Sequence, residues 1–209
     1  MVDLYTKMKL IAGLIGLIVA APGLAAEPPA SLHLERSKES PRHDMAVEYY
    51  VNDEHEHEIW LAAKNKPSDR ELLYKFERGA DVLISPDEQW LVVNDHMTSD
   101  ESEVVLFKRG QGISFAEAKG AQIGPKAWNL FAKENQLAKP PGYDHQYVEA
   151  IQWSSNSRTF LLSISGHGGE GDGKYHLDPW FCVYDVTTRQ PTLNFKLMNQ
   201  DAFVVEHKK

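Results

Sequence analysis

The chain has 209 residues and carries 22 basic against 30 acidic side chains, which gives a net charge of −8 at pH 7. An acidic surface repels phosphate backbones and anionic lipids, and no basic stripe interrupts it, so nucleic-acid-binding functions are excluded. The one cysteine, Cys182, excludes an internal disulfide.

The first 26 residues have the three parts of a secretory signal peptide. Lys7 and Lys9 precede the apolar stretch 10–21, and small residues follow it. The alternative is a membrane anchor, but this stretch is shorter than the ~20 residues that cross a bilayer. We therefore expect cleavage near Ala25 or Ala26 and a periplasmic or secreted product that does not span a membrane. The remaining residues, 27–209, are expected to form a single β-rich domain.

The first predicted unit covers about 32–78. Its turn sequence, Ser40-Pro41-Arg42-His43-Asp44, is followed by the apolar strand 45–50. Serine accepts a hydrogen bond at the first position of a type I turn, and proline fixes φ at the second. The stretch 71–76 is expected to supply a fourth strand.

Two histidines in the acidic stretch 53–58 form a candidate metal site. On a strand, His55 and His57 would point to one face, where they could hold a divalent transition metal with a third ligand. His96 and His167 are candidates for that ligand, because we expect them in the corresponding loops of later units. The alternative interpretation is a solvated acidic loop with incidental histidines.

The second predicted unit covers about 79–121 and repeats the first in register. Its turn begins at Ser85, which is 45 residues after Ser40 and lies between apolar runs in "DVLISPDEQWLVVND". At the same offset the stretch 58–61 matches 103–106. Two matches at one offset indicate a structural repeat.

An insertion of about 124–140 separates the second unit from the third. Apolar residues at helical spacing and the Pro140-Pro141-Gly142 stop predict one amphipathic helix. Trp128 and Phe131 have two interpretations: they pack on a sheet and cover an open edge, or they contact a partner protein.

The third predicted unit covers about 148–196. Its turn begins at Ser154, strand 159–164 follows, and 180–185 supplies another strand. Cys182 is expected to be a buried strand thiol. A further strand is expected at 202–205.

The glycine-rich stretch 167–174 matches three motifs incompletely. Tyr175 stands where a phosphate loop needs Ser or Thr, no G-x-S-x-G nucleophile elbow accompanies His167-Gly168-Gly169, and a calcium loop would have too few acidic ligands. We expect a hairpin loop here, with glycines supplying positive φ angles.

These units predict an all-β fold of blade-like, four-stranded antiparallel sheets with one helical insertion. The strands are nearly continuously apolar, so both faces must be covered, as in stacked propeller blades. Only three units fit, which indicates a partial or open β-propeller-like arrangement. A β-sandwich is the alternative with the same strand spacing.

The repeats "ISPDEQWLVV" and "WSSNSRTFLLSIS" resemble those of TolB-type and WD-repeat β-propellers, in which an S-P-D-x-x turn joins the first two strands of a blade. The resemblance covers about 32–195 in three divergent copies. It implies an architecture and a tendency to bind partners, and it implies no chemistry.

The preferred functional hypothesis is an exported, non-catalytic binding module for an envelope or cell-surface protein or for a second copy of the chain. No catalytic constellation stands out among the acidic and histidine residues, which favours a binder over an enzyme. The alternative is a metal-binding protein or metal-dependent hydrolase that uses the histidine rim.

Overall fold

The computed structural model describes residues 27–168 and 176–194. The expected signal peptide, most of the glycine-rich loop and the expected strand at 202–205 lie outside the described residues.

Twelve strands of the described chain form three four-stranded antiparallel sheets. The first sheet contains β1 (His33–Glu39), β2 (Met45–Val51), β3 (His57–Ala63) and β4 (Lys66–Phe76). The second contains β5 (Ala80–Ile84), β6 (Trp90–Asp95), β7 (Glu103–Arg109) and β8 (Phe115–Glu117). The third contains β9 (His145–Trp153), β10 (Thr159–His167), β11 (His176–Asp185) and β12 (Gln190–Thr192). Each sheet is a meander in chain order, so the prediction of an all-β fold of blade-like sheets is confirmed.

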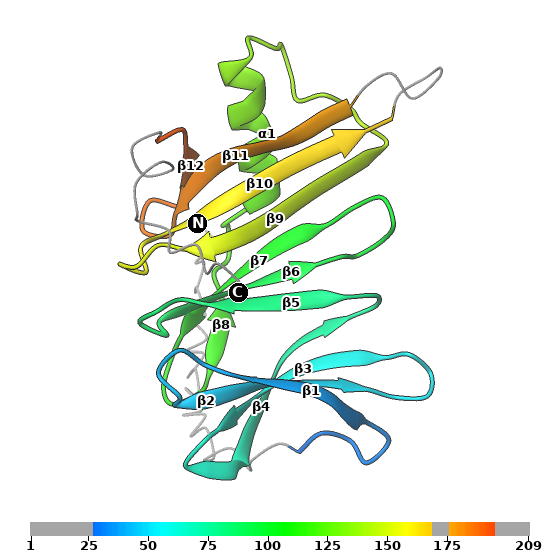
Figure 1. Cartoon of the computed structure of the whole chain (residues 1–209), viewed down its shortest axis with the longest axis vertical. Helices are drawn as coiled ribbons and strands as arrows, with labels where there is room; N and C mark the ends of the chain where they lie inside the picture. Colours follow the sequence, from blue (N-terminus) through cyan, green and yellow to red (C-terminus); the bar gives the residue numbers. More distant parts are fainter. Residues whose placement is uncertain (1–26, 169–175, 195–209) are drawn as a thin grey trace, which may run out of the picture.

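The three sheets stack as an open fan, with the second sheet in the middle (Figure 1). Strand β6 illustrates why its sequence is continuously apolar. Leu91 and Val93 pack in the cluster shared with the first sheet, whereas Val92 packs in the cluster shared with the third. A central sheet covered on both faces needs apolar residues at successive positions.

The three repeated turns have the same hydrogen bonds. In each turn, the first residue is a serine that bonds twice to the residue five positions later. The serine N–H donates to the backbone carbonyl of that residue, and the serine hydroxyl accepts from its N–H. These serines, Ser40, Ser85 and Ser154, are all buried. The fourth residue of each turn has a positive φ: 60° at His43, 57° at Glu88 and 60° at Ser157. This is a type I turn followed by a left-handed residue, which joins two strands tightly.

Helix α1 (Ile123–Glu134) fills the space beside the second and third sheets (Figure 1). It ends before the expected boundary at 140. Gln136 adopts φ 56°, and the N–H of Leu137 donates to the carbonyl of Ala132 at 2.8 Å. This left-handed cap ends the helix several residues before Pro140.

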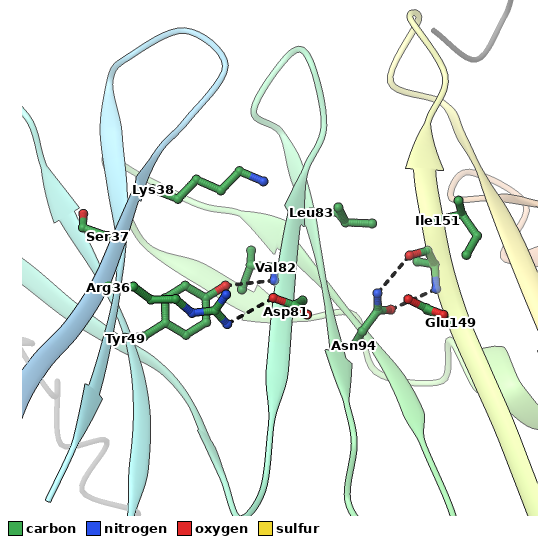
Figure 2. Close-up of a pocket in the computed structure, with 11 residues that line it drawn as sticks. Arg36, Ser37, Lys38, Tyr49, Asp81, Val82, Leu83, Asn94, Glu149 and Ile151 are labelled. Atoms are coloured by element: carbon green, nitrogen blue, oxygen red, sulfur yellow. Dashed lines mark hydrogen bonds and ion pairs between the residues drawn. The ribbon is translucent and has the colours of Figure 1, made fainter. Parts of the chain in front are cut away.

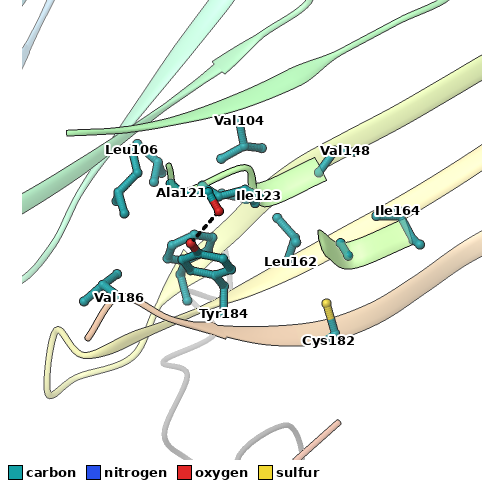
Figure 3. Close-up of a cluster of buried hydrophobic side chains, with 14 of the residues drawn as sticks. Val104, Leu106, Ala121, Ile123, Val148, Leu162, Ile164, Cys182, Tyr184 and Val186 are labelled. Atoms are coloured by element: carbon teal, nitrogen blue, oxygen red, sulfur yellow. Dashed lines mark hydrogen bonds between the residues drawn. The ribbon is translucent and has the colours of Figure 1, made fainter. Parts of the chain in front are cut away.

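The larger core cluster joins α1 to the second and third sheets (Figure 3). Cys182 is fully buried in it, as expected, beside Tyr184, whose hydroxyl donates to the Ala121 carbonyl at 3.1 Å. Burial raises the pKa of the Cys182 thiol to about 12, so the thiol is not ionised at neutral pH. The residue has a packing role.

Polar side chains tie the sheets together by bonding to strand edges. Asn94 of β6 donates to the Ala150 carbonyl and accepts from the Ala150 N–H, each at 2.9 Å. Ser102 makes the same pair of bonds with Val148. Between the first two sheets, Tyr49 accepts from the Val82 N–H. Such bonds satisfy backbone groups that an edge strand would leave unpaired.

Candidate functional site

A trough runs between the first strands of the three sheets, and we call it the inner trough. Figure 2 shows the residues that line its smaller hollow. It comprises two adjoining hollows of about 270 and 730 Å³ that share Lys38, Leu83 and Ile151. Strands β1, β5 and β9 contribute residues to both hollows. Because the first strand of each repeat occupies the same place in its sheet, the repeat itself builds this site.

The repeated turns close one end of the inner trough. The second residue of each turn, Pro41, Pro86 or Ser155, lines the larger hollow. All three residues are exposed. Equivalent positions in the three units therefore converge, although they are far apart in sequence.

Apolar side chains from β5 and β9 line the larger hollow. Leu83, Ile84, Ile151 and Trp153 contribute to it, and Ile151 is 40% exposed. Ile151 is the extra residue of a β-bulge, since Leu161 and Leu162 pair with Gln152 and Ala150. A β-bulge changes the direction in which a side chain points. The Trp153 indole donates to the Leu83 carbonyl at 3.0 Å, which fixes the ring at the trough wall.

The smaller hollow is charged. The Arg36 guanidinium lies 3.8 Å from the centre of the Tyr49 ring and bonds to the Ala80 carbonyl and to Asp81 (Figure 2). Burial raises the pKa of the Tyr49 phenol, so its oxygen accepts the Val82 N–H in the neutral state. Lys38 makes no ion pair to another described residue and is available to a ligand.

The four histidines of the candidate metal site do not come together: His55 and His57 line one hollow of about 400 Å³, whereas His96 and His167 lie elsewhere. His55 has φ 62° in the turn before β3, so it does not share a strand face with His57, whose ring stacks on Phe76 at 4.9 Å. His96 lines a different hollow, of about 200 Å³. Within 27–168 and 176–194, no group of three or more His, Cys, Asp or Glu side chains has an arrangement that could hold a metal ion.

His167 instead contacts His145, a residue that the sequence analysis did not select. Their rings stack at 4.1 Å, and Nδ1 of His145 lies 2.9 Å from Asp100. The two histidines are directly opposite on β9 and β10. Pairing the stretches 145–153 and 159–167 as antiparallel strands in the sequence would have placed these two histidines opposite each other.

Trp128 and Phe131 belong to the core. They are 5% and 8% exposed, and their rings meet edge to face at 6.0 Å. Phe131 also contacts Trp180 of β11. The structure supports the packing interpretation of these residues, because neither ring offers surface to a partner.

The strands on either side of the glycine-rich stretch, β10 and β11, pair antiparallel, with His167 opposite His176. Gly168 has φ 105°, and a Cβ there would lie 2.7 Å from the Asp144 carboxylate. Glycine is therefore required at the start of this connection.

Comparison with protein-family models and with curated proteins finds no match to this chain. None of the described helices is both long and apolar enough to cross a membrane.

Proposed function

We propose that this chain is an exported, non-catalytic binding module, built from three propeller-type repeats, that holds a segment of an envelope or cell-surface protein in its inner trough. The observation that carries the proposal is the convergence of the three repeats on one exposed, partly apolar trough. The signal-like N-terminal sequence supports export, and the acidic net charge supports a protein ligand over a nucleic acid.

The lining of the trough suits a polypeptide. Leu83 and Ile151 provide apolar contacts, and the exposed prolines at 41 and 86 add rigid surface. Lys38 and Glu149 contribute charges along the same walls. A few polar groups around an apolar floor give orientation as well as affinity in binding sites of this kind.

Substituting Ile151 with aspartate should weaken ligand binding at least about tenfold, because it removes apolar contact and puts a charge on the trough floor. The ligands are peptides selected against the wild-type protein from a displayed random library, and affinity is measured by fluorescence anisotropy. Leu137→Asp is the matched control, since Leu137 is 44% exposed and lies outside the trough.

Three results would refute the proposal. The library yields no peptide that binds wild type, the selected peptides bind Ile151→Asp as tightly as wild type, or Leu137→Asp weakens binding to the same degree. Circular dichroism of both variants establishes that each remains folded.

A further inference from the structure

Strand β1 differs from the other two first strands in how its free edge is satisfied. The outward backbone groups of β9 bond to Asn94 and Ser102, and those of Gln146 bond to the loop at 100–102. On β5, Val82 N–H and the Ala80 carbonyl bond to Tyr49 and Arg36. The free edge of β1 has no comparable partner in the described part of the chain, and all seven of its residues are exposed.

The register identifies which β1 groups point outward. The Ser40 N–H donates to the Met45 carbonyl, so these two residues form a hydrogen-bonded pair. Lys38 and Arg36, two and four residues before Ser40, lie opposite Val47 and Tyr49 in the same register and are also hydrogen-bonded positions. In an antiparallel pair, every second residue bonds to its partner strand and those between face away. The N–H and carbonyl groups of Ser37 and Glu39 therefore face away from β2. Both residues line the inner trough.

We infer that the trough's ligand is an extended polypeptide segment that pairs with β1 as a fifth strand of the first sheet. This inference rests on the proposed function and names the conformation of its ligand. Backbone N–H and carbonyl groups in alternation at a strand edge are complementary to another strand, and edge addition is a recurrent mode of peptide recognition.

The surroundings of β1 specify the sequence of that segment. A strand added about 4.8 Å from β1 would turn one face toward the floor of the trough. Leu83 and Ile151 lie on that side, and β1 itself is exposed along its whole length. The ligand should therefore alternate apolar and polar residues, with the apolar set against the second and third sheets.

Charges on β1 make this edge selective. The strand carries Glu35, Arg36, Lys38 and Glu39 among its seven residues. Charged side chains on an edge strand discourage indiscriminate pairing between copies of a protein. A partner segment that also fills the apolar floor gains contacts that offset this repulsion, so β1 is better suited to a partner strand than to a second copy of the chain.

The test uses Ser37→Pro and Ser37→Ala in the full chain. Proline at Ser37 removes an N–H that is not part of the β1–β2 ladder, so we expect the variant to fold, and circular dichroism checks this. The proline ring also blocks the approach of another strand. Alanine keeps the N–H. We expect peptides selected on wild type to bind Ser37→Pro at least about tenfold more weakly and to bind Ser37→Ala as tightly as wild type.

A second measurement uses the wild-type protein and the selected peptides with every second backbone nitrogen methylated. One methylation register removes the N–H groups that face β1, and we expect it alone to abolish binding; the other register should bind. The strand-pairing inference is overturned if Ser37→Pro binds the peptides as tightly as wild type and both methylated peptides bind as tightly as the unmethylated ones. If Ile151→Asp still weakens binding in that case, the proposed function stands without strand pairing. A concentration-dependent dimer blocked by Ser37→Pro would also overturn the strand-pairing inference, in favour of a second copy.

Discussion

Replacing Glu88 with alanine should lower the free energy of unfolding by about 4 kcal/mol. Glu88 is fully buried in the turn of the second sheet, yet it is a charged residue. One carboxylate oxygen accepts from the Arg42 N–H at 2.6 Å, and the other pairs with Arg109 at 3.2 Å. Alanine leaves the largely buried guanidinium of Arg109 and the Arg42 N–H without this partner, and loss of one member of a buried pair is costly.

Urea unfolding followed by circular dichroism measures this effect. Gln89→Ala is the control at the neighbouring exposed position and should change stability by less than about 0.5 kcal/mol. Glu88→Gln keeps the side-chain shape and one acceptor oxygen. It should therefore lower the free energy of unfolding by less than Glu88→Ala and by more than Gln89→Ala. A loss below about 1 kcal/mol for Glu88→Ala would mean that the carboxylate does not hold the first and second turns together.

Replacing Asn94 with alanine should lower the free energy of unfolding by about 3 kcal/mol, because two backbone groups of Ala150 lose their only described partners. Ala150 is 1% exposed in the wild-type protein. Each unsatisfied buried group costs about 1–3 kcal/mol.

The same urea experiment tests this prediction against Asn65→Ala. Asn65 is exposed, and its replacement should be close to neutral. If Asn94→Ala is as stable as Asn65→Ala, the second and third sheets do not depend on this side chain for their contact.

The strands and turns could be predicted from sequence because they depend on local chemistry. Ser40, Ser85 and Ser154 each precede the same backbone bonds, and those bonds need only neighbouring residues. Pro140 predicts a later helix end than the one at Glu134. The left-handed conformation of Gln136, a residue with no strong preference for it, ends the helix earlier.

The trough could not be predicted because it depends on how the sheets stack. Glu88 lies in a polar turn and Asn94 near a strand end, and nothing local in the sequence indicates that either is buried. Their burial follows from the proximity of neighbouring turns and edges. Pro41, Pro86 and Ser155 occupy equal positions in the repeats, which was visible in sequence, but only the stacking brings them to one hollow.

An NMR titration of the purified protein with a selected peptide locates the binding site. We expect the shifts of the Ile151 methyl groups and the Trp153 indole N–H to saturate together, while the Ser37 and Glu39 amides become protected from hydrogen exchange. The control residue Leu137 should not change. Saturating binding that leaves Ile151, Trp153, Ser37 and Glu39 unchanged would place the ligand outside the inner trough and rule out binding there.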